Sequence, residues 1–309
     1  MTLRSEVTGG LASAGLDAGE VERVVRTAVE EDFRYGPDVT SAATAAPGER
    51  AAAAVVARQA GVLAGLPVAL AVLDLAGVAP AACQALRRDG DRIEAGDEVL
   101  RIAGPLREML AAERTLLNFL THLSGVATAT RAWVDAVAGT GCAVRDTRKT
   151  LPGLRQLEKY AVRCGGGVNH RMGLGDAALV KDNHVAAAGG VAAAIAAVRR
   201  AAPDLPLEVE CDTLEQVADA LAAGAGLILL DNMGLAGLRA AVLLARQYPG
   251  TRLEASGGLR LETARTVAET GVDYVAVGAL THSSPALDLG LDLAAGGQAP
   301  DCRTSRGRT

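Results

Sequence analysis

The chain has 309 residues, a formal net charge of −5, and a composition that is 50% hydrophobic but only 2% aromatic. This length allows two domains or one barrel with an extension, and the scarcity of aromatic residues predicts a thin, closely packed core of Ala, Val and Leu, as in α/β folds. The start has no signal-peptide pattern, and the longest apolar stretch, 60–73, is too short and too broken to span a bilayer, so we expect no membrane association.

Five cysteines are spread along the chain without a C-x-x-C pair: Cys83, Cys142, Cys164, Cys211 and Cys302. Their odd number and wide spacing indicate neither a disulfide framework nor a zinc site. We therefore expect reduced, buried thiols in a cytoplasmic protein.

The first third of the chain predicts a mixed α/β sandwich. Apolar residues at helical spacing predict an amphipathic helix over 20–33, and turn-forming residues predict a loop over 30–41. Residues 50–63 and 91–102 have the composition of strands, the second one split by a hairpin turn at 95–97.

Pro105 stands where a helix can begin, and the apolar residues after it predict one long helix that bridges two domains. We expect an N-terminal domain over 1–120 and a second domain over 121–284. The segment 285–295 is expected to pack back on the first domain, and the polar, turn-forming residues 296–309 predict a disordered tail.

A regular alternation of short apolar runs and helical stretches follows the long helix. The runs predict strands at 142–145, 177–180, 207–209, 227–230, 252–255 and 274–277, and helices are expected at 191–202, 213–223, 235–248 and 261–270. This alternation is typical of a parallel βα array. Because no G-x-G-x-x-G follows the first of these strands, we favour a barrel or partial barrel of about six strands over a dinucleotide-binding fold.

Polar, charged or glycine-rich residues follow all six of these predicted strands. They are Asp146-Thr147-Arg148-Lys149, Lys181-Asp182-Asn183-His184, Glu210-Cys211-Asp212, Asp231-Asn232, Ser256-Gly257-Gly258 and Gly278-Ala279-Leu280. Active sites of βα barrels lie at the carboxyl ends of the strands. We therefore expect these residues to line one site.

The segment from Arg145 to His184 carries an excess of positive charge. It contains all three lysines of the chain, Lys149, Lys159 and Lys181. Eight Lys and Arg residues face four Asp and Glu residues there, a balance of +4 in a chain of −5. A cationic segment in an anionic protein predicts a site for a small polyanion and not a nucleic-acid-binding face.

The glycines and the acids of the predicted strand ends suit different ligands. The loops opened by Ser256-Gly257-Gly258 and by Gly278 can hold a phosphate monoester with backbone N–H groups. Glu210 and Asp231 end adjacent strands, where they can hold Mg²⁺, bind sugar hydroxyls, or stabilise positive charge on a sugar carbon. A surface ion pair or a helix cap is the alternative for either acid.

Arginine suits bidentate binding of a carboxylate, and lysine suits a mobile pyrophosphate. The candidate cations are Arg148, Lys149, His170, Arg171 and Lys181. A buried structural histidine is the alternative for His170. Arg155, Lys159 and Arg163 share one face of a helix and either line the entrance or are solvated with Glu158, the second interpretation being slightly favoured.

Several longer motifs occur in one order along the chain: EEDFRYGPDVTS, ERTLLNFLTHLSGVAT, DTRKT, LEKYAV, NHR, EVECDTLEQV, LLDNM, LEASGGL and GVDYVAVGALTHS. With this set the chain resembles the quinolinate phosphoribosyltransferases, the decarboxylating nicotinate-nucleotide pyrophosphorylases. The resemblance implies an N-terminal α/β sandwich domain, an open, atypical (β/α)₆ TIM-like barrel, and a homodimer. One departure is Pro37, which interrupts the family's early YGDVTS.

The resemblance also implies a reaction and the residues that perform it. Such an enzyme transfers phosphoribosyl from phosphoribosyl pyrophosphate (PRPP) to quinolinate, with decarboxylation and with Mg²⁺, in NAD biosynthesis. By position, quinolinate would be bound by Arg148, His170, Arg171 and Lys181, with Arg114 supplied by the neighbouring subunit. Lys149, Glu210 and Asp231 would be catalytic, Lys149 toward PRPP and the two acids toward its ribose and Mg²⁺. Its 5′-phosphate would be bound by Ser256, Gly257, Gly258 and Gly278.

Two other functions are compatible with parts of the sequence. A phosphoribosyltransferase-like paralogue of metal-uptake operons would share the architecture, but the complete DTRKT and NHR motifs argue against it. A non-catalytic sugar-phosphate-binding barrel would need only the glycine loops. The presence of Lys149, Glu210 and Asp231 argues against that alternative, because binding alone does not require all three.

Overall fold

The computed structural model describes residues 2–294, and the tail predicted at 296–309 lies outside them. The chain forms two compact units, one up to Thr128 together with the segment from Pro285 onward, the other Ala129–Ser284. The first boundary lies inside helix α5 (Leu106–Ala136), later in the chain than the boundary expected at 120.

The first unit is built on a four-stranded antiparallel sheet in the order β12-β1-β5-β3. Its strands are β1 (Arg50–Ala57), β3 (Cys83–Ala85), β5 (Glu98–Pro105) and β12 (Leu289–Leu293), and β2 (Gly61–Val62) pairs separately with β4 (Arg92–Ile93). Strand β12 pairs with β1 from Leu293 opposite Ala53 to Leu289 opposite Ala57. The last described strand therefore completes the sheet of the first unit.

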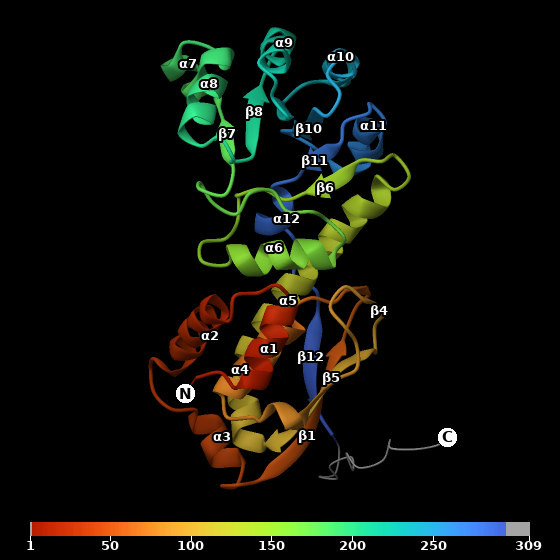
Figure 1. Cartoon of the computed structure of the whole chain (residues 1–309). Coiled ribbons are helices and arrows are strands. Elements are labelled where there is room, and N and C mark those ends of the chain that lie inside the picture. Colours follow the sequence, from red (N-terminus) through yellow and green to blue (C-terminus); the bar gives the residue numbers. More distant parts are fainter. Residues whose placement is uncertain (1, 295–309) are drawn as a thin grey trace, which may run out of the picture. The chain divides into compact units, whose positions relative to one another are not determined.

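Helices α1, α2 and α4 pack against one another beside this sheet (Figure 1). The helical elements of this unit are α1 (Ser5–Ser13), α2 (Ala18–Phe33), α3 (Val39–Thr44), α4 (Leu66–Leu75), the short 3₁₀ turn η1 (Pro80–Ala82) and the first part of α5. Helix α2 confirms the predicted amphipathic helix, because Val21, Val24 and Val25 are all buried. Asp17 caps it by accepting a hydrogen bond from the backbone N–H of Glu20 at 2.8 Å.

The structure corrects two details predicted for this unit. The loop expected over 30–41 is shorter, because α2 continues to Phe33 and α3 begins at Val39. The hairpin expected at 95–97 is wrong: β4 pairs with β2, whereas β5 pairs with β1 and β3. The turn instead closes on the end of β1, where the N–H of Gly96 donates to the carbonyl of Ala57 at 2.8 Å.

The second unit is a six-stranded parallel sheet in the order β6-β11-β10-β9-β8-β7, with helices outside it (Figure 1). All six predicted strands form, as β6 (Ala143–Arg145), β7 (Ala178–Val180), β8 (Leu207–Cys211), β9 (Leu227–Asp231), β10 (Arg252–Ser256) and β11 (Tyr274–Ala276). Its helices are the end of α5, α6 (Arg155–Cys164), α7 (Asp182–Ala188), α8 (Val191–Ala201), α9 (Leu214–Ala222), α10 (Leu235–Ala245), η2 (Leu261–Thr263), α11 (Ala264–Ala268) and α12 (Ala279–His282). Because β6 and β7 are edge strands that do not pair, the barrel is open, as expected.

Burial on both faces explains the continuous apolar runs of these strands. In β9, for example, Ile228, Leu229 and Leu230 are all buried, and polarity begins only at Asp231. Because the six strands are parallel, their carboxyl ends share one edge of the sheet. This places the six polar strand ends of the sequence at one end of the barrel.

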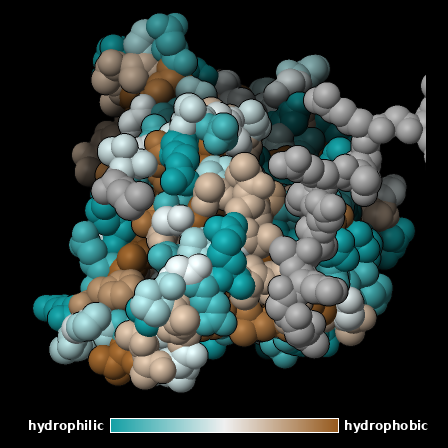
Figure 2. Space-filling view, turned by 90° about the horizontal axis from the view of Figure 1, so that it is seen from below, coloured by the Kyte–Doolittle hydropathy of each residue, from teal (hydrophilic) through white to brown (hydrophobic). Residues whose placement is uncertain are grey.

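No helix within residues 2–294 is long and apolar enough to cross a bilayer. On the face drawn in Figure 2, outside the grey atoms, polar and apolar residues are mixed in small groups. The four cysteines that the structure describes are free of disulfides.

Candidate active site

Neighbouring strand ends of the second unit are linked in pairs. At the β7–β8 pair, the ammonium of Lys181 lies 2.5 Å from a carboxylate oxygen of Glu210. At the β9–β10 pair, Asp231 stands opposite Ser256 in the parallel register. Two predicted substrate residues from different strands, Lys181 and Glu210, are thus in direct contact.

The β6 and β11 ends meet through Lys149 and Gly278. A Cβ added to Gly278 would lie 2.9 Å from Cδ of Lys149, so a side chain there would displace the lysine stem. The hydroxyl of Thr281 also donates to the carbonyl of Lys149 at 2.8 Å. The loop after β6 is therefore fixed against the start of α12, with the Lys149 side chain exposed.

The loop after β10 contains two successive glycines with positive φ, Gly257 at +88° and Gly258 at +61°. Such a turn is strained for any residue that carries a Cβ. Because neither glycine has a side chain, the backbone of this turn is uncovered next to Asp231. The helix-cap alternative for Asp231 is wrong, because Gly234 is the N-cap of α10 and no side chain caps that helix.

Arg148 and Arg171 form a pair of half-buried cations with unused donors. The Nε atom of each is buried and has no hydrogen-bond partner within the described residues. Burial, and then the charge of Arg148, lower the pKa of Arg171. Nη1 of Arg171 already donates to the carbonyl of Ala177 at 2.9 Å, so its unpartnered donor is Nε. Two mutually repelling guanidinium groups, each with such a donor, are suited to a ligand that carries two carboxylates.

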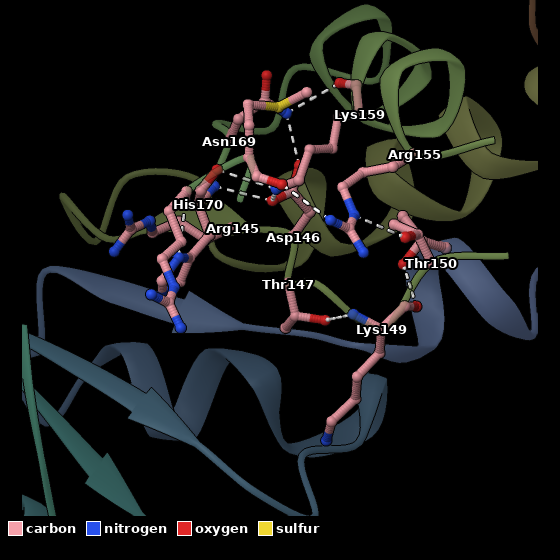
Figure 3. A network of polar contacts seen from close by, with 12 residues as sticks. Arg145, Asp146, Thr147, Lys149, Thr150, Arg155, Lys159, Asn169 and His170 are labelled. Carbon is pink, nitrogen blue, oxygen red and sulfur yellow. Dashed lines mark hydrogen bonds and ion pairs between the residues drawn. The ribbon is translucent and has the colours of Figure 1, made fainter. Parts of the chain in front are cut away.

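A buried network centred on Asp146 holds these loops in place (Figure 3). The Asp146 carboxylate accepts hydrogen bonds from the ammonium of Lys159, from the side-chain amide of Asn169 at 2.5 Å, and from the backbone N–H of His170 at 2.8 Å. Lys159 also donates to the carbonyl of His170 at 2.9 Å. One carboxylate thus ties the end of β6 and helix α6 to the loop that carries His170 and Arg171.

The solvated interpretation of the α6 charges is wrong for Lys159 and Glu158. Lys159 and Glu158 are both completely buried in the structure. Burial lowers the pKa of Lys159, while the Asp146 carboxylate acts in the opposite direction. By contrast, Arg155 is half-buried and Arg163 is exposed.

His170 is buried, and both of its ring nitrogens are engaged within the protein. Its Nδ1 accepts from the backbone N–H of Arg171 at 2.7 Å, and its Nε2 lies 2.8 Å from a carboxylate oxygen of Glu208. Since Nδ1 is an acceptor, the hydrogen of the neutral ring is on Nε2. His170 therefore has the contacts of a buried structural histidine, which was the alternative to a substrate-binding role.

Two glutamates that the sequence analysis missed lie inside the barrel. Glu208 is buried at the second position of β8 and Glu254 in the middle of β10, and Arg145 lies 2.5 Å from Glu254. Burial and the charge of Glu208 raise the pKa of Glu254 to about 8, against the opposing effect of Arg145. With Glu254 protonated, the charges of Arg145 and Glu208 balance within the barrel interior.

A metal ion does not fit this interior cluster. The ligand-type atoms of His170, Glu208 and Glu254 lie within 4.8 Å of one another. However, the histidine nitrogen that faces the acids carries the hydrogen, so it has no free lone pair for a cation. Arg145 is a further positive charge in contact with Glu254.

Two cavities border Arg171, and neither is lined by the strand-end acids. One of about 290 Å³ reaches Leu207 and Leu227 at the starts of β8 and β9, the opposite end of the barrel from the strand ends. The other, of about 510 Å³, is lined mainly by apolar residues of β7, α7 and α8, including Leu179 and Val198. The candidate site therefore consists of the strand ends themselves.

Arg114 belongs to the first unit. It lies on α5 and is exposed. The next residue, Thr115, donates to a carboxylate oxygen of Asp32 at 2.9 Å, which fixes this part of α5 against the end of α2.

Comparisons with known proteins cover both units. The family model described as "Quinolinate phosphoribosyl transferase, N-terminal domain" matches residues 38–124, and the corresponding C-terminal domain matches residues 126–292. The chain belongs to the quinolinate phosphoribosyl transferase family. It is 55% identical over 271 residues to the nicotinate-nucleotide pyrophosphorylase (carboxylating) of Mycobacterium leprae, covering 87% of this chain and 95% of that protein.

Other members of the family show the same relationship. A probable nicotinate-nucleotide pyrophosphorylase of Synechocystis is 44% identical over 77% of this chain and 81% of its own length. The crystal structure of NadC from Streptococcus pyogenes superposes with a TM-score of 0.84 and 41% identity, over 90% of this chain and 99% of that one. The structure of the nicotinate-nucleotide pyrophosphorylase from Francisella tularensis superposes with a TM-score of 0.82 and 36% identity, over 89% of this chain and 96% of that one. The α/β fold with its TIM-like barrel is thus the fold of the family.

Proposed function

We propose that this protein is a quinolinate phosphoribosyltransferase, a pentosyltransferase of NAD biosynthesis. It transfers phosphoribosyl from PRPP to quinolinate, with decarboxylation, to give nicotinate mononucleotide, pyrophosphate and CO₂. Family membership over both units supports the reaction. The observation that carries the proposal is the Arg148–Arg171 pair, whose buried, unpartnered Nε atoms suit a dicarboxylate.

Quinolinate binds through its two carboxylates. We assign the first contacts to Arg148 and Arg171, since a guanidinium group binds a carboxylate through two parallel N–H donors. Lys181 adds a third cation when its ammonium leaves the Glu210 carboxylate and contacts quinolinate. His170 would have to release Glu208 to donate to quinolinate, so its first contribution is to hold the backbone of Arg171.

PRPP occupies the neighbouring strand ends. Lys149, a mobile point charge, binds the pyrophosphate. The glycine turn of Ser256, Gly257 and Gly258, together with Gly278, binds the 5′-phosphate through backbone N–H groups. Glu210 and Asp231 face the ribose between these two ends.

The chemistry joins the pyridine nitrogen to C1 of the ribose while the C1–O bond to pyrophosphate breaks. Positive charge develops on the sugar in the transition state, and the carboxylates of Glu210 and Asp231 stabilise it. Lys149 stabilises the negative charge of the departing pyrophosphate. The ring nitrogen is now cationic, so the C2–carboxylate bond can break with release of CO₂. The electron pair stays on C2 beside that nitrogen and then takes up a proton.

Mg²⁺ fits the donor chemistry of this site. Carboxylate oxygens are the protein ligands that Mg²⁺ prefers, usually one or two of them with waters and substrate phosphates. Asp231 is half-buried at its strand end and would hold the ion, and Glu210 would join it once Lys181 turns from it to quinolinate. When bound, Mg²⁺ neutralises charge on the pyrophosphate.

We further propose a homodimer in which Arg114 enters the barrel site of the neighbouring subunit. Large apolar side chains are exposed at the end of α2 and in the residues that follow it, with Phe33 at 42%, Tyr35 at 93% and Val39 at 71%. Exposed apolar groups of this kind mark interaction surfaces. The Thr115–Asp32 hydrogen bond brings Arg114 to the same end of α2.

Incubation with quinolinate, PRPP and Mg²⁺ tests the activity, with CO₂ and pyrophosphate both measured. We expect equal amounts of the two products from quinolinate and little of either from nicotinate, which lacks the second carboxylate. Binding of PRPP without release of either product would instead support the non-catalytic barrel. For the dimer, mixing inactive Arg114→Ala and Lys149→Ala chains should restore activity, whereas no restoration would refute the shared site.

A further inference from the structure

Asn232 occupies an unusual backbone conformation directly after Asp231. Its φ of +53° makes it the one non-glycine residue with positive φ in residues 2–294. Asparagine tolerates the left-handed region better than most residues, but the conformation still has a cost. Such conformations persist where the surrounding contacts over-determine them, often at functional sites.

The contacts of Asn232 reach two neighbouring strand ends. Its side-chain Nδ2 donates to Oδ2 of Asp231 at 2.6 Å. Its backbone N–H donates to the carbonyl of Ser256 at 2.9 Å, which extends the β9–β10 pairing by one residue. One residue therefore contacts both an acid and the start of the glycine turn.

The side chain of Asn232 also packs against Gly257. A Cβ added to Gly257 would lie 2.6 Å from Cγ and 2.9 Å from the backbone nitrogen of Asn232, and closer still to its Oδ1. Glycine at 257 is thus required by Asn232 as well as by its own φ of +88°. The amide fits between the acid on one side and the bare backbone of the turn on the other.

We propose that Asn232 is a positioning residue for the phosphoribosyl donor, because it sets the spacing between the Asp231 carboxylate and the Gly257–Gly258 turn. The inference rests on the proposed function, in which Asp231 faces the ribose of PRPP and the turn binds its 5′-phosphate. Asn232 acts through these two elements and does not touch the reacting atoms.

A purely structural role does not account for these features. Asn232 is exposed, so its side chain adds little to the core. It does not cap α10, whose N-cap is Gly234. The amide nitrogen instead donates a hydrogen bond to one oxygen of the Asp231 carboxylate at the strand end.

Three substitutions separate the backbone from the side chain. Asn232→Gly accepts the positive φ without strain but loses the amide, Asn232→Asp keeps the shape but replaces the donor with a second carboxylate, and Asn232→Ala loses the amide and adds strain. Gln247→Ala, which removes an exposed amide just past the other end of α10, is the matched control.

We expect Asn232→Gly to raise KM for PRPP roughly tenfold, the scale of a lost hydrogen bond to a charged group. Asn232→Asp should raise it further, since two adjacent carboxylates repel. KM for quinolinate should change less than about twofold in both, because the dicarboxylate lies on other strand ends. The melting temperature of Asn232→Gly and of the control should match that of the wild type.

Unchanged KM for PRPP in Asn232→Gly and Asn232→Asp would overturn the inference. Equal increases in KM for both substrates, accompanied by a lower melting temperature, would also overturn it, because they describe general disruption. Failure of the proposed function is a separate result, since the unmodified protein would then release no pyrophosphate or CO₂ from quinolinate and PRPP.

Discussion

Replacing Lys159 by methionine tests the buried network beneath the candidate site. Lys159 and Asp146 are both completely buried and form an ion pair. Methionine has a similar length but cannot donate, so Asp146 keeps only the donors of Asn169 and His170. The carboxylate then remains buried without a compensating charge.

Removing one partner of a buried ion pair costs about 3–5 kcal/mol, because the remaining charge is neither solvated nor neutralised. For a unit of this size, about 1 kcal/mol corresponds to about 2–4 °C in melting temperature. Lys159→Met should therefore lower the melting temperature by roughly 6–20 °C. The double variant Asp146→Asn/Lys159→Met removes the stranded charge and should be more stable than Lys159→Met alone.

Urea and thermal unfolding of the full chain measure these changes. Arg200→Met on α8 is the control, because Arg200 is exposed and a surface substitution should change the free energy of unfolding by less than about 0.5 kcal/mol. A double variant no more stable than Lys159→Met would contradict the reasoning, since the loss would not then come from an unpaired carboxylate. Stability equal to the wild type in Lys159→Met would contradict the burial itself.

Three further predictions concern pH, specificity and packing. The pKa of Glu254 is raised from 4.5 to about 8, chiefly by burial, so between these values the folded state binds more protons than the unfolded state. The free energy of unfolding therefore falls as pH rises through about 8, by at most about 1.4 kcal/mol per pH unit. Glu254→Gln should flatten this slope in urea titrations. Arg171→Lys should raise KM for quinolinate roughly tenfold or more and that for PRPP less than about threefold, because lysine lacks the guanidinium fork. Gly278→Ala should lower kcat/KM for PRPP roughly tenfold, because the added Cβ would lie 2.9 Å from Cδ of Lys149 and displace its stem.

Each of these predictions has a contradicting result. A Glu254→Gln protein with the same pH slope as the wild type would show that Glu254 is not the group that titrates. Equal effects of Arg171→Lys on both substrates would argue against a dicarboxylate pocket. Gly278→Ala activity like that of the wild type would show that Lys149 does not depend on its present path.

The six strands of the barrel and their polar ends could be predicted from local patterns. An apolar run such as Leu227–Leu230, followed by Asp231, is enough to predict a strand and its end, because a strand buried on both faces must be apolar and its loop must be polar. The same holds for α2, where the spacing of valines defines the buried face.

The burial of charged side chains could not be predicted from the sequence in the same way. Lys159 and Glu158 on α6 have the sequence pattern of a solvated helix face, and only the tertiary contact with Asp146 explains why Lys159 is buried. A weak signal existed for Glu208 and Glu254, since each interrupts an apolar strand at a position where alternation directs the side chain inward. The hairpin at 95–97 failed for a related reason, because turn residues do not specify which strands pair.

The structure of a complex with quinolinate tests the central claim most directly. We predict that the two carboxylates lie on the guanidinium groups of Arg148 and Arg171, with the ring nitrogen facing the side of Lys149. Quinolinate bound without contact to either guanidinium group would contradict it.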